Sequence, residues 1–268
     1  MNEAARQAVQ VVDSHAHLDM RDFDPDRVEI LVRAGRAGVR TILVPADLTA
    51  SDSLSVTEGM KDLFPGLIAA AGVHPHQAKS YGEVHAKAVR ELAARGKISA
   101  VGEIGLDYHY DFSPRRVQMD AFRSQLAAAR SAGLPVIVHS RLAIKEVLEA
   151  LKAESFDCGG ILHCYTEDAE AALRVLERGF YVSFSGILTY PRAGNVREAA
   201  RALPAERLLV ETDAPYLVPQ ALKTGRKRNE PAFVVETLRV LAAVRGIPYE
   251  EAGRLVTENF AALFPAGR

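Results

Sequence analysis

The 268-residue sequence lacks several features that would each define a class of protein. Apolar runs such as Leu67–Ala71 are far shorter than the about 20 residues that a membrane-spanning helix needs. The polar segment Met1–Gln10 lacks the apolar stretch of a secretory signal. The two cysteines, Cys158 and Cys164, do not make a disulfide framework. We therefore expect a protein of the reduced cytoplasm with no membrane association.

An excess of positive charge is also missing, because 33 basic and 34 acidic residues give a formal net charge of −1. No overall positive field holds a long polyanion, so any contact with nucleic acid requires a local patch. An apolar content of 48% and a charged content of 25% are ordinary for a soluble enzyme with a sizeable core. The sequence shows neither a low-complexity linker nor a composition break, which favours a single domain over residues 1–268.

Short runs rich in Val, Ile, Leu and Ala recur along the chain, with helical patterns between them. Their continuous apolar character is typical of parallel strands that are buried on both faces. The runs predict eight strands, at Val11–His17, Thr41–Val44, Leu67–Val73, Ala100–Ile104, Val136–His139, Gly160–His163, Tyr181–Phe184 and Leu208–Glu211. Such strands, alternating with helices, predict an α/β fold of the (β/α)8 or TIM-barrel type.

Helix-boundary signals lie between the predicted strands. Asp24-Pro25 is typical of an N-cap followed by a first helical position, and Gly38 of the end of that helix. Ser113-Pro114 predicts the start of another helix, which Gly133 ends. The last helical pattern has one apolar stripe, made of Ala252, Leu255, Val256, Phe260 and Leu263.

Six residues of metal-ligand type stand where predicted strands end: His15, His17, Glu103, His139, His163 and Asp213. A barrel gathers the carboxyl ends of its strands at one rim, so these scattered side chains would meet there. Four imidazoles and two carboxylates are the inventory with which proteins hold two divalent cations. The joint pattern favours a metal-hydrolase site.

Local spacing suggests roles for some of the six. Residues two apart in a strand project to the same face, so His15 and His17 can chelate one ion. Glu103 has two carboxylate oxygens and can bridge two cations, and Asp213 can touch one ion and accept a proton from its water. Judged alone, each has a structural alternative, such as a core histidine, a solvated loop carboxylate or a helix N-cap. For Asp107, in the same segment as Glu103, we expect a hydrogen-bonding role.

Seven short strings of the chain occur together in one known family. They are Asp13–Asp19 (DSHAHLD), Gly72–His76 (GVHPH), Val101–Asp107 (VGEIGLD), Leu134–Arg141 (LPVIVHSR), Ile161–Cys164 (ILHC), Glu211–Leu217 (ETDAPYL) and Lys227–Pro231 (KRNEP). From about Val12 to Phe264 the chain resembles the TatD-related metal-dependent deoxyribonucleases of the amidohydrolase superfamily. The chain departs from the family pattern at Leu142, where an acidic residue is common, and at Tyr165-Thr166-Glu167, where Phe-Ser/Thr-Gly is typical. Both departures concern substrate preference and leave the expected ligands intact.

The resemblance implies two ion sites that share one carboxylate. One set is His15, His17, Glu103 and Asp213, and the other is Glu103, His139 and His163. It also implies that His74, and with it His76, faces the scissile phosphate, whereas from the sequence alone His74-Pro75-His76 could equally be a rigid loop end. Imidazoles favour Zn²⁺, Mn²⁺, Co²⁺ or Ni²⁺ over Mg²⁺, whereas nucleases of this family are commonly assayed with Mg²⁺, so the sequence leaves the metal open.

The expected reaction is hydrolysis of phosphodiester bonds by a water that two metal ions activate. Asp213, Glu103 and His74 are the expected catalytic residues. Contacts with substrate phosphates are expected from His76, Arg141 and Arg228, the last in the basic run 224–229. With so few basic groups, single-stranded DNA or strand ends are the expected substrate. No obligate protein partner is indicated, so we expect a monomer or a small homo-oligomer.

Two other functions fit part of the pattern. The first is a hydrolase of the same superfamily that acts on a small cyclic amide, lactone or phosphoester. Many such enzymes bridge their ions with a carbamylated lysine at a strand end, but the nearest lysine, Lys97, precedes the fourth predicted strand. The second is a binding or scaffold protein with a vestigial site, which predicts lost ligands, and all six are present.

Overall fold

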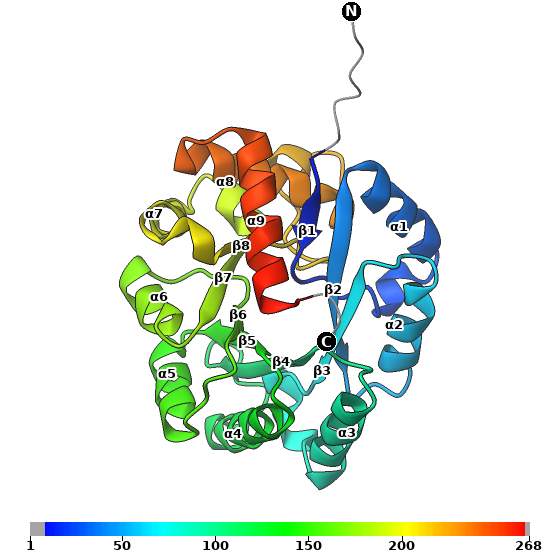
Figure 1. Cartoon of the computed structure of the whole chain (residues 1–268), viewed down its shortest axis with the longest axis vertical. Helices are drawn as coiled ribbons and strands as arrows, with labels where there is room; N and C mark the ends of the chain where they lie inside the picture. The colour runs from blue at the N-terminus through cyan, green and yellow to red at the C-terminus, as the bar shows by residue number, and fades with distance from the viewer. Residues whose placement is uncertain (1–8, 266–268) are drawn as a thin grey trace, which may run out of the picture.

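A computed structural model describes residues 9–265 as an eight-stranded parallel barrel with helices around it (Figure 1). The strands pair in the order of the sequence, so each is hydrogen-bonded to the next along the chain. They are β1 (Val11–Asp13), β2 (Val39–Asp47), β3 (Leu67–Gly72), β4 (Ala100–Asp107), β5 (Val136–Arg141), β6 (Gly160–Leu162), β7 (Phe180–Phe184) and β8 (Leu208–Val210). The predicted TIM-barrel fold is confirmed.

Backbone hydrogen bonds just beyond the strand ends bring β1 beside β8. Ser14 N–H donates to the Val210 carbonyl (3.1 Å), and Asp213 N–H donates to the His15 carbonyl (2.9 Å). His17 N–H donates to the Ala214 carbonyl at 2.8 Å. The first and last strands of the sheet are therefore neighbours, and residues from both ends of the chain reach the same rim.

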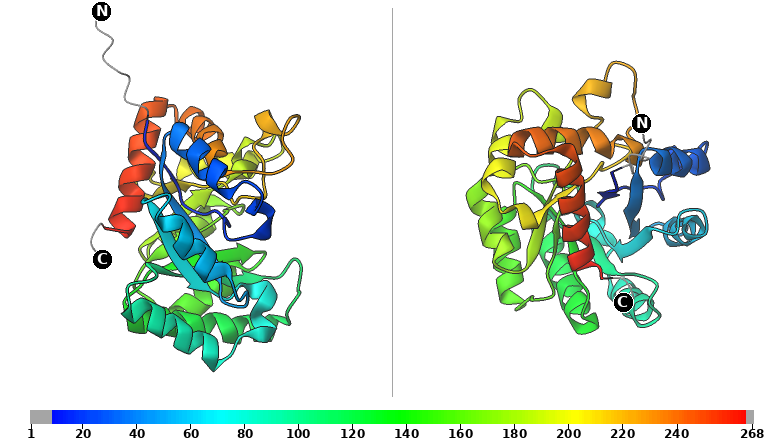
Figure 2. Two further views of the ribbon diagram at one scale, coloured as in Figure 1. Left: turned by 90° about the vertical axis from the view of Figure 1, so that its right-hand side faces the viewer. Right: turned by 45° about the horizontal axis from the view of Figure 1, so that its top comes forward.

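The principal helices surround the barrel, and α9 packs against both β1 and β8 (Figure 1). They are α1 (Arg27–Arg36), α2 (Ser53–Lys61), α3 (Glu83–Ala94), α4 (Arg115–Ala132), α5 (Ile144–Ala153), α6 (Ala169–Leu176), α7 (Gly194–Ala202), α8 (Val234–Arg245) and α9 (Tyr249–Leu263). Short 3₁₀ turns punctuate several connections, and the connection from β8 to α8 projects from the barrel (Figure 2).

Strand burial follows the expected pattern. Ile42, Leu43 and Val44 are consecutive in β2 and all fully buried, because one side faces the barrel interior and the other faces the helices. The strand bounds differ in places from those predicted: β1 ends at Asp13 instead of His17, and β4 continues to Asp107 instead of ending at Ile104.

One predicted helix start is wrong and another is confirmed within a residue. The helix expected from Asp24-Pro25 begins instead at Arg27, with Asp26 at its N-cap position. Arg27 donates to the Leu18 carbonyl (2.8 Å) and pairs with Asp24 (2.7 Å), so Asp24 anchors a side chain and does not cap the helix. Helix α4 follows Pro114 and ends before Gly133, as predicted.

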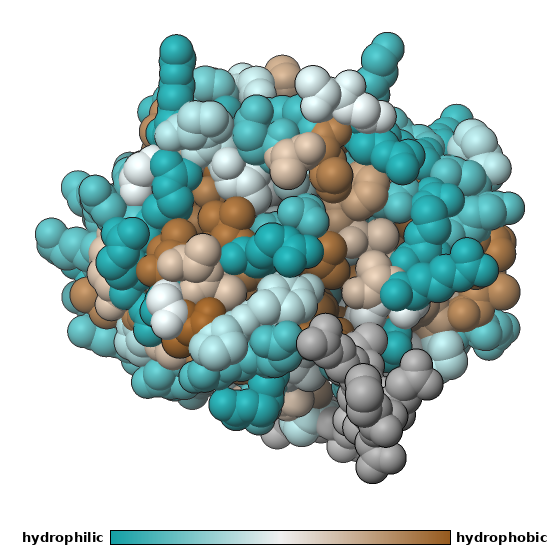
Figure 3. All heavy atoms as spheres, turned by 90° about the horizontal axis from the view of Figure 1, so that it is seen from above, coloured by the Kyte–Doolittle hydropathy of each residue, from teal (hydrophilic) through white to brown (hydrophobic). Residues whose placement is uncertain are grey.

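The surface mixes polar and apolar residues. On the face shown in Figure 3, hydrophilic residues surround a smaller group of apolar ones. Within residues 9–265, the structure contains no helix with the length and apolar character that crossing a membrane requires.

Candidate metal centre

The six side chains expected at strand ends converge at the carboxyl ends of the strands. His15 and His17 follow β1, His163 follows β6 directly, and Asp213 follows β8. Glu103 and His139 lie within β4 and β5, because both strands extend further than the sequence indicated. In a TIM barrel this rim carries the catalytic groups.

Two glycines in β4 allow Glu103 to lie against the next strand. A Cβ atom on Gly102 would lie 2.6 Å from the Cβ of Ile137, so only glycine permits this approach of β4 to β5. Gly105 has a φ of +140°, and a Cβ atom there would lie 2.0 Å from the carbonyl oxygen of His139. The register between the strands also shifts between Val101 and Ile104. The local sequence thus places the Glu103 carboxylate beside the β5 histidine.

One oxygen of Glu103 belongs to a first donor set on the β1 and β8 side. Its Oε2 lies 3.2 Å from His15 Nε2 and 3.4 Å from His17 Nε2. Asp213 Oδ1 completes the set, 3.8 Å from the first of these nitrogens and 3.5 Å from the second. Two imidazole nitrogens thus each lie within 3.8 Å of oxygens from two carboxylates.

The other oxygen of Glu103 faces a second donor set on the β5 and β6 side. Its Oε1 lies 2.8 Å from His163 Nε2 and 2.9 Å from His139 Nδ1. The rings of His15 and His163 stack with centroids 4.0 Å apart, so the two sets are adjacent. A single buried carboxylate therefore divides its two oxygens between separate groups of imidazoles.

The chemistry of these atoms fits divalent cations. Glu103 Oε2 is buried and, within the described chain, has no hydrogen-bond partner. His139 Nε2 lies 3.1 Å from Asp107 Oδ2, which fixes the ring proton there and leaves the lone pair of Nδ1 facing Glu103 Oε1. A lone pair that faces a carboxylate oxygen requires a cation or a proton between them. The two sets offer the nitrogen and oxygen ligands that such ions bind.

The pKa shifts within the cluster also indicate that its carboxylates are stabilised by nearby positive charge. Burial would raise the pKa of Glu103, but the surrounding imidazoles hold it well below the ordinary 4.5. Burial opposes a charge on His17, yet Asp213 and Glu103 raise its pKa to about 9. The pKa of His163 is raised as well, against burial, by Glu103 and Glu211. Either protons or divalent cations can supply this positive charge.

Buried carboxylates behind the donor sets orient them. Asp107 accepts from the backbone N–H groups of His109 and Tyr110 through Oδ1 and contacts His139 through Oδ2, as expected. Glu211 Oε1 lies 3.3 Å from His163 Nδ1 and accepts from the Cys164 N–H at 2.7 Å.

Asp13 joins β1 to the segment that carries Asp213. It accepts from the N–H (2.9 Å) and the hydroxyl (2.6 Å) of Thr212. Sequence reasoning assigned no role to Asp13 or Glu211. Asp13 lies in the family string DSHAHLD and Glu211 in the string ETDAPYL. Membership of these strings is the one clue to their roles that the sequence offers.

His74 lies at the edge of the second set as a hydrogen-bond donor. Its Nδ1 accepts from the N–H of His76 (3.1 Å), and its Nε2 lies 3.1 Å from Glu103 Oε1. Burial and the neighbouring imidazoles lower the pKa of His74 to about 4, so the ring is neutral near pH 7. A neutral ring that accepts at Nδ1 carries its proton on Nε2, and a protonated nitrogen is not a metal ligand. The neutral ring therefore presents an N–H to the site, although His74 also lies close enough to Glu103 and His139 to hold an ion with them.

The three residues expected to contact substrate lie in different settings. His76 Nε2 is 2.8 Å from Asp107 Oδ2, beside the second donor set. Arg141, at the exposed end of β5, holds its guanidinium over the ring of Tyr110. Arg228 instead pairs with both oxygens of Asp26, at 2.7 and 2.8 Å. A phosphate contact by Arg228 stays a prediction, and it requires the guanidinium to leave this carboxylate.

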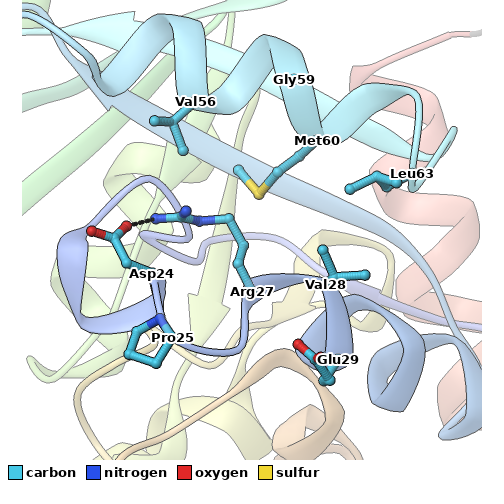
Figure 4. A pocket seen from close by; sticks show the side chains of 9 residues that line it. All are labelled: Asp24, Pro25, Arg27, Val28, Glu29, Val56, Gly59, Met60 and Leu63. Atoms are coloured by element: carbon cyan, nitrogen blue, oxygen red, sulfur yellow. Dashed lines mark hydrogen bonds and ion pairs between the residues drawn. The ribbon is translucent and has the colours of Figure 1, made fainter.

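A groove on the outside of the barrel is unrelated to this cluster. It lies between α1 and α2 and is lined by apolar side chains such as Val28, Met60 and Leu63 (Figure 4). Its charged residues include the Arg27–Asp24 pair, and no histidine lines it. The groove therefore lacks the ligand-type side chains that the rim has.

Comparisons with known proteins identify the family of the chain. The family model described as TatD related DNase matches residues 12–265. The metal-dependent hydrolase YcfH of Escherichia coli K12 is 39% identical over 261 residues, which is 95% of each chain. The 3'-5' ssDNA/RNA exonuclease TatD of Rahnella sp. is 34% identical over 253 residues, 92% of this chain and 95% of that one.

A solved structure shows the same likeness in three dimensions. The crystal structure of YJJV, a TatD homologue from Escherichia coli K12, superimposes with a TM-score of 0.87 at 30% identity. The match covers 96% of this chain and 98% of that one. A family match over nearly the whole chain, together with these relatives, settles the family. The chain belongs to the TatD-related DNase family and is a metal-dependent hydrolase.

Proposed function

We propose that this protein hydrolyses phosphodiester bonds of single-stranded nucleic acid, DNA in the first place, with two divalent ions held at the rim. The observation that carries the proposal is the division of Glu103, whose two oxygens face separate donor sets. Two ions bridged by one carboxylate are the arrangement of many phosphodiester hydrolases. The nuclease name of the Rahnella relative supports a nucleic acid substrate.

The donor sets assign a role to each ligand. His15, His17, Glu103 and Asp213 would hold one ion, and Glu103, His139 and His163 the other. Such ions supply positive charge that acidifies a water and neutralises developing charge on phosphate oxygens. Asp107 and Glu211 contact the His139 and His163 rings and would keep them oriented toward bound ions.

Asp213 is the proposed acceptor of the proton from the attacking water. Burial would raise its pKa, but His17 and the other imidazoles around it lower the pKa below its ordinary value. The carboxylate is therefore ionised near neutral pH and free to take a proton. His74 Nε2–H, on the other side of Glu103, would donate a hydrogen bond to a phosphate oxygen.

The charge of the molecule favours a short or single-stranded substrate. A net charge of −1 offers little attraction to a long duplex. The structure gives no support to a lysine-bridged hydrolase of cyclic amides, because Lys97 precedes β4 and pairs with Glu58 at 3.0 Å. In the proposed site, Glu103 would take the bridging role of such a lysine.

The test is incubation of the purified protein with 5′- and 3′-labelled single-stranded DNA and RNA of one sequence, with Mg²⁺ or Mn²⁺. We expect mononucleotides or short products, and the label that is released first gives the polarity. Asp213→Asn should lower the rate about 100-fold or more, because a positioned base contributes at least that much. Asp120→Asn, on the exposed face of α4, is the matched control and should leave the rate unchanged.

Cyclic amides, lactones and phosphotriesters are assayed in parallel. If nucleic acid stays intact while one of these compounds is hydrolysed in an Asp213-dependent manner, the proposed substrate class is wrong. If no substrate reacts and the protein takes up no metal, the rim is a vestigial site.

A further inference from the structure

The loop from β4 to α4 exposes two aromatic rings at the rim. Tyr110 is 48% exposed and Phe112 is 58% exposed, although large apolar side chains of a stable domain are usually covered. Their rings are nearly parallel, with an angle of 7° and centroids 5.3 Å apart. The two rings therefore form a preformed aromatic stack that is open to solvent, and we call it the rim aromatic pair.

The rim aromatic pair is tied directly to the second donor set. The N–H of Tyr110 donates to Asp107 Oδ1 (2.9 Å), and the other oxygen of Asp107 contacts His139 and His76. The ring of His76 stands nearly perpendicular to both aromatic rings, 5.6 Å from Tyr110 and 4.8 Å from Phe112. A single carboxylate thus connects the exposed rings to a proposed ligand, so the pair has a defined position relative to the second donor set.

A cation accompanies the rings. The guanidinium of Arg141 lies 4.7 Å from the centroid of Tyr110, and no carboxylate in residues 9–265 forms an ion pair with it. Leu142, the next residue, is exposed and apolar, so it supplies no carboxylate to Arg141. The guanidinium of Arg141 can therefore bind an anionic ligand while it stacks on Tyr110.

We propose that the rim aromatic pair is a subsite for one unpaired nucleobase, next to the phosphate that is cleaved. Stacked aromatic rings beside an arginine are the means by which proteins hold single-stranded nucleic acid without reading its sequence. A base in a duplex is already paired and stacked, so the subsite would favour single strands and frayed ends. This inference rests on the proposed function and adds a specificity element to it.

The first test separates base binding from phosphate chemistry. Tyr110→Leu, Phe112→Leu and the double variant remove the aromatic faces but keep the backbone N–H that holds Asp107. We expect KM for a single-stranded oligonucleotide to rise about tenfold in each single variant and more in the double variant, with kcat changed less than about twofold. Hydrolysis of methyl p-nitrophenyl phosphate, a diester without a base, should stay unchanged, which also shows that the metal centre is intact. Phe112→Trp should restore oligonucleotide binding.

Tyr249→Leu is the matched control. Tyr249 begins α9 and also carries an arginine over its ring, Arg239 at 5.3 Å. It lies outside the rim, so both substrates should be hydrolysed as by the unaltered protein. Equal loss of activity on both substrates in the rim variants would mean that the rings only support the metal centre, and the subsite would be rejected.

The second test measures stacking without turnover. In Asp213→Asn with Mn²⁺, 2-aminopurine is placed at each position of the oligonucleotide in turn. We expect fluorescence quenching at one position next to the scissile bond and its loss in the Tyr110→Leu/Phe112→Leu background. Quenching that is absent, or that survives in this background, contradicts the subsite.

The outcomes keep the two proposals apart. If the unaltered protein cleaves single strands and the rim variants keep their KM, the subsite alone is wrong. If the unaltered protein neither cleaves nor binds nucleic acid, the proposed function is wrong and the subsite is rejected with it.

Discussion

At the scale of single residues, the position of one proton on the histidine ring distinguishes His139, a proposed ligand, from His74, a proposed donor. His139 gives its Nε2 proton to Asp107 and turns Nδ1 to the cluster, whereas His74 accepts at Nδ1 and turns Nε2–H to it. Two imidazoles that both touch Glu103 therefore have opposite chemical characters. Distance alone would assign both of them to metal binding.

His74 should be replaceable by another donor but not by an apolar residue. His74→Leu is expected to lower the rate of phosphodiester hydrolysis about 100-fold, because a hydrogen bond to the charged phosphate is lost. His74→Gln, which keeps an N–H donor, should retain activity within about tenfold of the original rate. Metal content per chain, measured by mass spectrometry after chelation and reloading, should be the same in both variants. A drop to about one ion per chain would identify His74 as a ligand.

The residues that the sequence revealed are those whose chemistry is visible locally. The six candidate ligands were recognised because each is a polar residue at the end of an apolar run, and the structure brings all six together. The role of Asp13 is not predictable from the sequence, because its hydrogen-bond partner, Thr212, lies near the other end of the chain. The stacking of Tyr110 on Phe112 was equally invisible, since it depends on the conformation of the loop from β4 to α4.

At the scale of elements, strands were easier to predict than helix starts. A strand buried on both faces leaves a continuous apolar run, whereas Asp24-Pro25 has the composition of a helix start but lies in a loop. That loop is fixed by Arg27, which reaches back to the Leu18 carbonyl. Such a contact between loop and helix leaves no trace in local sequence. The bulged register of β4 against β5 was likewise not predictable from apolar content.

A latch of charges joins α1 to the long connection between β8 and α8. Asp26 pairs with Arg228 from that connection and with Arg33 of α1, and Arg33 also pairs with Glu230 at 2.7 Å. Burial would raise the pKa of Asp26, but the two guanidinium groups lower it below its ordinary value of 3.8. The latch holds the projecting loop beside the first helix and explains why Arg228 is engaged.

Removing the Asp26 charge should destabilise the protein near neutral pH but not in acid. A carboxylate whose pKa is lower in the folded state stabilises that state above its unfolded pKa, and this contribution disappears as the pH falls through the folded pKa. Asp26→Asn should therefore lower the free energy of unfolding by about 1–2 kcal/mol at pH 7 and by much less at pH 3. Urea denaturation at both pH values measures it.

Asp24→Asn is the control for the latch. Asp24 also forms a short ion pair, with Arg27, but it is more exposed, so the loss should stay below about 0.5 kcal/mol. A difference between Asp26→Asn and the original protein that is equal at pH 7 and pH 3 would show that packing, and not charge, holds the loop.

At the scale of the whole molecule, the proposed ions would act as clamps. Their ligands come from segments at β1, β4, β5, β6 and β8, so bound cations would connect most of the barrel at one rim. An ion that binds only the folded state stabilises it by about 2.7 kcal/mol at 100 times its dissociation constant. Without the ions, only protons on the imidazoles can supply the positive charge that holds the clustered carboxylates together.

Chelation should lower the unfolding temperature. Metal analysis of reloaded protein should give about two ions per chain, and their removal should lower Tm by roughly 5–10 °C per ion. Glu103→Gln, which takes the shared carboxylate charge from both donor sets, should bind much less metal and show little response to chelator. A Tm that is the same with chelator and with added metal, in protein that contains no ions, would reject the clamp.

The adjacency of β1 and β8 also determines when during its synthesis the chain can first become an enzyme. His15 leaves the ribosome early, but Asp213 and the last strand are made only after most of the barrel has been translated. Until then the edge of β1 has no neighbour to close the sheet, and one acid of the first donor set does not yet exist. Because the proposed site needs Asp213, we expect chains that end before β8 to show no hydrolysis, and activity to begin only with a nearly complete translation product.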